Sequence, residues 1–134
     1  MRNYFLGLCL LFALCFTACS HSDDSVDVLI IGGGASGVTA GIQSARMGAA
    51  TLIVEETEWL GGMLTSAGVS AVDGNYDLPA GLFGEFREHL ADYYGGLDSL
   101  KTGWVSAVLF EPSVGNKIFH EMVDAEKNLK VWHN

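Results

Sequence analysis

A cluster of four glycines follows an apolar run near the start of the chain. Residues 28–31 read Val-Leu-Ile-Ile, and Gly32, Gly34 and Gly37 then satisfy the spacing G-x-G-x-x-G. Glycine is costly in ordered chain because it loses more backbone entropy on folding than any other residue. Backbone without side chains can, however, approach the phosphates of a dinucleotide closely. The spacing therefore indicates a site for a pyrophosphate group.

Each position of this motif has its own physical task. Gly32 allows a tight turn out of the strand, Gly34 leaves room for the pyrophosphate, and Gly37 lets the following helix pack close to the strand. The start of the following helix presents amides without partners and a partial positive charge to the phosphates, and Ala35 and Ser36 lie in the turn that leads to it. We therefore predict that these five residues contact the cofactor.

A carboxylate stands at the end of the next apolar run. Residues 51–54 read Thr-Leu-Ile-Val, and Glu55 follows 18 residues after Gly37. An acid at about this distance binds the ribose hydroxyls in dinucleotide sites, and it would repel the 2′-phosphate of NADP. We assign this role to Glu55 because it is the first polar residue beyond the strand, and we interpret Glu56 as its solvated neighbour.

These motifs must be positioned by alternating strands and helices. We expect an α/β fold, a partial Rossmann-like parallel sheet of three strands with helices that is incomplete at the C-terminus. The expected strands are 28–31, 51–54 and 129–132, and the expected helices are 38–47, 81–94 and one that opens at Glu111-Pro112. Residues 56–110 would interrupt the second crossover of the sheet.

The inserted region and the last helix carry weaker signals. We interpret residues 64–75 as loop or short extended pieces, with Thr65 and Ser66 as ordinary loop hydroxyls, and residues 104–110 as a strand or an approach segment. Apolar spacing predicts buried helix positions: Phe83 and Phe86 on one helix, and Val114, Ile118, Met122 and Ala125 on the other.

A second glycine pair lies behind Glu55, in the stretch Trp59-Leu60-Gly61-Gly62-Met63. With it, the chain resembles the FAD-dependent oxidoreductases that have a glutathione-reductase-like FAD domain. In that group a strand, G-x-G-x-x-G, a helix, a second strand, a glutamate and a Gly-Gly pair follow in this order. The segment is also similar to exported bacterial members of the FAD-dependent oxidoreductase family. The resemblance covers residues 27–71 closely and the rest more loosely.

The resemblance implies FAD rather than NAD as cofactor and hydride transfer through the flavin as activity. It places Gly61, Gly62 and Met63 beside the pyrophosphate and ribityl region of FAD. A second segment of bare backbone also suits a long dinucleotide held between two glycine turns, although a plain turn would use the same residues. No catalytic residue and no small-molecule substrate follow from these residues.

The first nineteen residues are typical of a targeting signal rather than of a folded domain. Residues 1–19 carry a positive charge at Arg2, continue with an apolar run too short to span a bilayer comfortably, and end Phe16-Thr17-Ala18-Cys19. They resemble a bacterial lipoprotein signal, which implies lipidation of Cys19 and an anchored position in the cell envelope, outside the cytoplasm. An ordinary signal peptide or an uncleaved anchor is the alternative. Residues 20–25 form a polar tether, and residues 26–134 the N-terminal part of an FAD-binding domain.

Composition narrows the classes of partner. The net charge of −9 argues against nucleic acid. All three cysteines lie within residues 1–19 and the four histidines share no short ligand spacing, so we expect no metal site. Relatives in the resembled family run to several hundred residues, which implies that this chain is part of a longer flavoprotein. A truncated non-catalytic fragment and an NAD-binding module are the alternatives.

Overall fold

The computed structural model describes residues 25–74, 76–78, 80–104 and 106–134. The predicted signal with Cys19 and most of the tether lie outside the described residues. The elements in chain order are β1 (Val28–Ile31), α2 (Ala35–Arg46), β2 (Thr51–Glu55), η1 (Gly62–Leu64), β3 (Ala71–Val72), α3 (Gly81–Tyr94), η2 (Leu97–Leu100), β4 (Val108–Leu109), α4 (Pro112–Asp124) and β5 (Leu129–His133).

The main sheet has three parallel strands in the order β1-β2-β5. Leu29, Leu52 and Lys130 lie in one row across the strands, and Ile31, Val54 and Trp132 in the next row of the same face. The parallel three-stranded sheet predicted from the sequence is therefore confirmed. Its order places β2, which ends in Glu55, between the other two strands.

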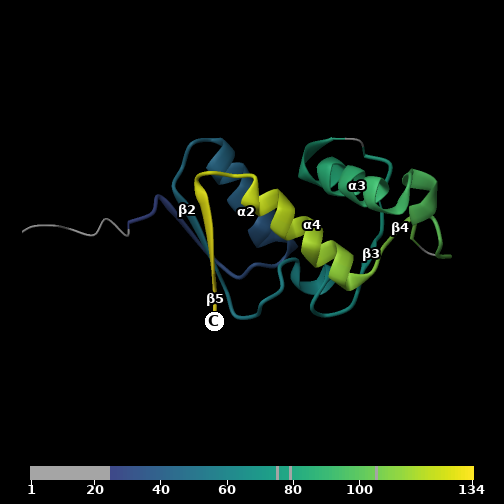
Figure 1. The fold of residues 1–134 in the computed structure, drawn as a ribbon, viewed down its shortest axis with the longest axis horizontal. Coiled ribbons are helices and arrows are strands. Elements are labelled where there is room, and N and C mark those ends of the chain that lie inside the picture. Colours follow the sequence, from purple (N-terminus) through teal and green to yellow (C-terminus); the bar gives the residue numbers. More distant parts are fainter. Residues whose placement is uncertain (1–24, 75, 79, 105) are drawn as a thin grey trace, which may run out of the picture.

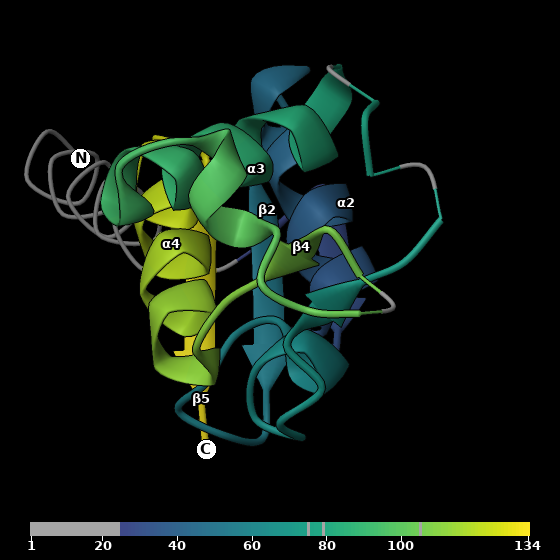
Figure 2. The same ribbon diagram turned by 90° about the vertical axis from the view of Figure 1, so that its right-hand side faces the viewer.

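The helices cover one face of this sheet in two layers. Figure 1 shows the sheet on one side, α2 and α4 beside it, and α3 beyond them. Figure 2 shows the molecule from the side of α3, which lies in front of α2 and α4. Gly41 lets α2 lie close to β2, since an added Cβ would be 2.7 Å from Ile53 Cδ1. Phe86 of α3 stacks on Phe119 of α4 at 4.5 Å between ring centroids and joins the helical layers.

Several details differ from the sequence predictions. Helix α2 begins at Ala35, three residues before the predicted start, because the glycine turn passes directly into helix. Strands β3 and β4 lie within the ranges expected to hold short extended pieces and a strand, but their antiparallel pairing into a small separate sheet was not predicted. Val114, Ile118 and Met122 are buried as predicted, but Ala125 is exposed because α4 ends at Asp124.

The second face of the main sheet has apolar side chains in contact with solvent. Leu29 is 57% exposed, Ile31 76% and Trp132 58%. Parallel sheets normally have both faces covered, so an apolar face of this kind is unusual. Among the described residues, no helix is both long and apolar enough to cross a membrane.

Candidate functional site

The three glycines of the motif meet three separate physical requirements. Gly32 has φ of +98°, a conformation that side-chain-bearing residues rarely adopt. Gly37 is needed for packing, because an added Cβ would overlap the carbonyl oxygen of Gly32. Gly34 has an ordinary φ of −62°, and an added Cβ would meet no described atom within 4 Å. The fold therefore explains Gly32 and Gly37 but leaves Gly34 without a structural reason to be glycine.

The open space beside Gly34 lies at the start of α2. Gly34 is the residue before the helix and offers no side-chain cap, and no acidic residue occupies the first turn. The first amides of a helix have no acceptor within the helix, and they carry its partial positive charge. The amides of Ala35, Ser36 and Gly37 thus form a position suited to an anion.

The second glycine segment lies against the first. The Gly61 amide donates to the Gly33 carbonyl at 2.8 Å, and Gly34 and Gly61 form an isolated parallel bridge. Gly62 is equally close, since an added Cβ would be 3.0 Å from Gly34 Cα. Met63 follows in η1 and is 68% exposed. Two stretches of bare backbone, 27 residues apart in sequence at their point of contact, therefore form one surface.

Polar side chains hold this second segment in place. Thr65 is buried and donates through Oγ1 to the Leu60 carbonyl at 2.6 Å. Asn116 of α4 accepts from the Leu60 amide at 2.8 Å. Ser66 donates to the Gly62 carbonyl at 3.2 Å. Thr65 and Ser66 thus have partners within the loop, in agreement with their interpretation as loop hydroxyls.

The Glu55 carboxylate faces the glycine turn. It accepts a hydrogen bond of 2.5 Å from the Gly33 amide through Oε2, and two from Thr57 through Oε1, at 3.0 Å from the amide and 2.8 Å from the hydroxyl. Partial burial is the largest influence and opposes ionisation, but these hydrogen bonds and the nearby His133 outweigh it and lower the pKa of Glu55. Glu55 is therefore held as a carboxylate at neutral pH, while Glu56 is exposed to solvent.

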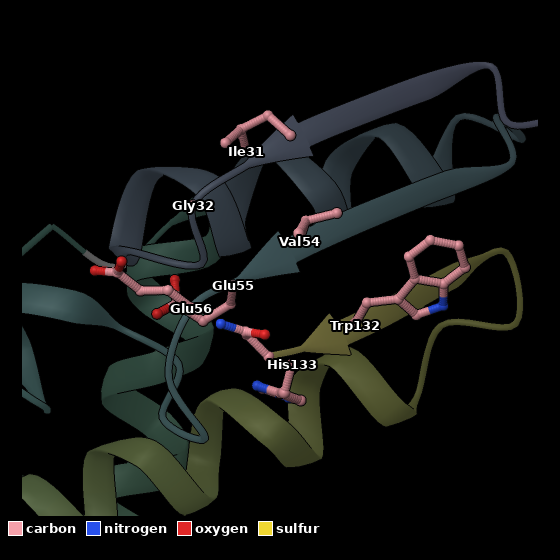
Figure 3. A pocket seen from close by; sticks show the side chains of 8 residues that line it. Ile31, Gly32, Val54, Glu55, Glu56, Trp132 and His133 are labelled. Atoms are coloured by element: carbon pink, nitrogen blue, oxygen red, sulfur yellow. The ribbon is translucent and has the colours of Figure 1, made fainter.

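An open cavity of about 480 Å³ lies at the carboxyl ends of the three strands, between Gly32 and the Glu55–Glu56 pair. Figure 3 shows Ile31, Val54 and Trp132 at its apolar side, projecting from three neighbouring strands. Ligands of open α/β sheets bind outside the carboxyl ends of the strands. The cavity thus combines an apolar wall with a carboxylate beside the glycine turn.

Sequence reasoning missed three residues of this site. Gly33 fills a variable position of the motif, yet it is buried, binds Glu55, and has no room for a Cβ, which would be 2.7 Å from Leu60 Cδ2. The run of three consecutive glycines at 32–34 is the sequence signal that could have identified Gly33. Thr57 orients the carboxylate, and His133 lies opposite Glu55 in the strand register. The contact of Thr57 is local, because Thr57 lies only two residues after Glu55. The position of His133 has no signal in the sequence, because it depends on which strands pair.

The donor set fits a dinucleotide rather than a metal ion. Amides of a helix start, a bare-backbone surface and an ionised carboxylate are the groups that bind pyrophosphate and ribose hydroxyls. In the part of the chain that the structure describes, no group of three or more His, Cys, Asp or Glu side chains is arranged to hold a metal.

Solved structures of other proteins are similar to this chain. The structure is similar to THI4 of Thermovibrio ammonificans, with 19% identity and a TM-score of 0.53 over 99% of this chain, which shows the shared fold. A flavoprotein disulfide reductase, RclA of Escherichia coli, is 14% identical, with a TM-score of 0.43 over 80% of this chain and 21% of its own. The chain spans about half, 47%, of the THI4 chain.

No curated protein was found to match the sequence. The family model described as FAD dependent oxidoreductase, by contrast, matches residues 27–134, which include the glycine motif, Glu55 and the second glycine segment. This match indicates FAD as the cofactor. The chain belongs to the FAD dependent oxidoreductase family.

Proposed function

We propose that residues 26–134 form the FAD-binding portion of an oxidoreductase that transfers a hydride through the flavin. The observation that carries this proposal is Gly34: the fold gives no reason for glycine there, whereas a pyrophosphate between α2 and the second glycine segment does. When bound, FAD would supply the redox chemistry, and the protein would bind, orient and shield it.

In this proposal the chain holds FAD at three places. The amides from Ala35 to Gly37, together with the bare backbone of Gly32 and Gly34, bind the pyrophosphate. Glu55 accepts hydrogen bonds from the adenosine ribose. Gly61 to Met63 lie beside the pyrophosphate and ribityl chain, as in the glutathione-reductase-like members of the family. The adjacency of Gly34 and Gly61 supports this division, because both segments reach the same ligand surface.

Binding of FAD to the full chain tests the proposal. Titration in detergent should quench flavin fluorescence with FAD but not with FMN, which lacks the adenosine half. A Glu55→Gln variant should bind FAD roughly tenfold or more weakly, since it loses a charge-assisted acceptor of about 1.5–3 kcal/mol. Glu58→Gln is the matched control, because Glu58 is exposed and is not among the residues that line the cavity. Equal affinity for FAD and FMN would refute the assignment of the ribose site.

We also propose that the protein is anchored outside the cytoplasm through lipid on Cys19. The support is the sequence of residues 1–25, with its apolar run, small residues before Cys19 and polar continuation. Stable anchoring takes more than one acyl chain. Cell fractionation of a Cys19→Ser variant tests this: the protein should leave the membrane fraction, and unchanged partitioning would refute lipidation.

Finally, we propose that further parts of a longer flavoprotein cover the exposed apolar face of the sheet. The exposed Ile31 and Trp132 support this, because buried parallel sheets are covered on both faces. A double variant Ile31→Lys, Trp132→Lys should reduce binding of an apolar dye by the full chain without lowering its thermal stability. A large loss of stability would show that these side chains are already packed.

A further inference from the structure

We propose that His133 is a positioning residue for the ribose-binding carboxylate, and that it acts on Glu55 through Thr57. The inference rests on the proposed function, in which Glu55 binds the ribose of FAD. It assigns a role to the last residue of β5, which lies 78 positions from Glu55 in sequence and beside it in the sheet.

The strand register brings His133 to the site. β5 pairs in parallel with β2, and His133 is the partner of Glu55 at the carboxyl end of that pairing. The Asn134 amide donates to the Glu55 carbonyl at 3.1 Å, which fixes the backbone on both sides of this contact. His133 is one of the residues at the rim of the cavity described above (Figure 3).

Two consecutive contacts connect the imidazole to the carboxylate. His133 Nδ1 lies 2.6 Å from the Thr57 carbonyl oxygen, which can only accept, so Nδ1 carries the donated proton. The same Thr57 donates its amide and its hydroxyl to Glu55 Oε1. The residue that orients the carboxylate is thus itself held by the imidazole.

The loop needs such a support. Residues 56–61 between β2 and η1 belong to no helix or strand, so no regular pattern of backbone hydrogen bonds holds them in place. Gly33 orients Oε2 from the glycine turn, so Thr57 is the residue that orients Oε1. If Thr57 moves, Oε1 loses both of its donors and the carboxylate can rotate away from a ribose. A carboxylate fixed before binding loses less entropy when the ligand arrives.

A neighbouring histidine provides the matched comparison. His120 of α4 lies beside His133, with 5.6 Å between ring centroids, and both side chains are near the same loop. Its Nε2 is 3.4 Å from the Glu58 carbonyl, a longer contact to a residue that does not bind Glu55. Removal of either imidazole changes the same surface, but removal of His133 alone breaks the connection to the carboxylate.

Two measurements on the full chain in detergent test the proposal. FAD affinity is measured by fluorescence quenching, and hydrogen exchange of the Thr57 amide is measured without ligand. His133→Leu should weaken FAD binding about fivefold and speed Thr57 exchange by a similar factor. His133→Asn should restore both to within about twofold, because the Asn amide nitrogen can take the place of Nδ1. His120→Leu should change neither quantity.

Coupling to Glu55 separates positioning from general support of the fold. In a Glu55→Gln background, His133→Leu should no longer affect FAD affinity. An equal loss in both backgrounds, or an equal loss in His120→Leu, would overturn the proposal. If Glu55→Gln weakens FAD binding while His133→Leu does not, this inference fails and the proposed function stands. If the wild-type chain does not bind FAD, the proposed function fails first and this inference with it.

Discussion

A single methyl group added at Gly34 should separate the effect on FAD binding from the effect on the stability of the fold. The φ of Gly34, −62°, suits any residue, and an added Cβ would point into open space. Gly34→Ala loses the preference for glycine before a helix, about 0.5–1 kcal/mol, but gains about 0.4–1 kcal/mol because the unfolded chain has less freedom. The free energy of unfolding should therefore change by less than about 0.5 kcal/mol.

The same methyl group should interfere with binding. It would occupy the space beside the first amides of α2, where the pyrophosphate is proposed to lie. Loss of one charge-assisted hydrogen bond, about 1.5–3 kcal/mol, weakens FAD binding roughly 10- to 100-fold. Chemical denaturation gives the first quantity, and fluorescence titration with FAD gives the second.

Gly37→Ala provides the contrast, because its Cβ would overlap the backbone oxygen of Gly32. Backbone must then move, and we expect a loss of about 1–3 kcal/mol in stability together with weaker binding. The reasoning would be refuted if Gly34→Ala kept the wild-type affinity for FAD, or if it destabilised the chain as much as Gly37→Ala does.

Three other perturbations test the framework around the site. Arg46 donates to Glu85 through two nitrogens, at 2.7 and 2.8 Å, and to Glu126 at 2.7 Å. Arg46→Met should therefore lower the free energy of unfolding by about 1 kcal/mol in low salt, and by less at high salt, which screens these ion pairs. The hydrogen bonds from Arg46 also lower the pKa of Glu85 from its ordinary 4.5. The ionised Glu85 therefore stabilises the folded chain above pH 4.5, and this stabilisation is lost as the pH falls through the lower folded pKa. In an acid titration, the free energy of unfolding should fall less in Arg46→Met than in the wild type. Thr65→Val should cost about 1–3 kcal/mol in thermal unfolding, because it leaves the buried Leu60 carbonyl without its hydroxyl donor; an unchanged melting temperature would contradict that contact.

Local patterns in the sequence were sufficient for the strands, the glycine turn and the carboxylate. The apolar runs, the glycine spacing and the position of Glu55 all depend on neighbours close in sequence, and the parallel sheet confirms the fold they predict. The contribution of His133 could not be predicted in this way. It depends on the register of β5 beside β2, which tertiary packing determines.

The helix boundaries also differ in how far the local sequence predicts them. The early start of α2 follows from Gly34, whose backbone leads directly into helix, whereas sequence composition indicated helix only from Val38. Ala125 was expected to be buried because it continues the spacing of Met122. The helix ends one residue earlier, so that periodicity no longer applies, and Val123 is buried instead.

The strand order has a consequence for how the site is made during synthesis. The glycine turn and Glu55 leave the ribosome early, but the neighbour of β2 on its other side is β5, which follows roughly seventy residues later. At about 5–20 residues per second, several seconds pass before Leu129–His133 can add to the sheet. Until then the loop that carries Thr57 lacks its contact from His133. The nascent chain therefore has the phosphate-binding turn before it has a completed ribose site, and tight FAD binding should begin only after β5 has paired.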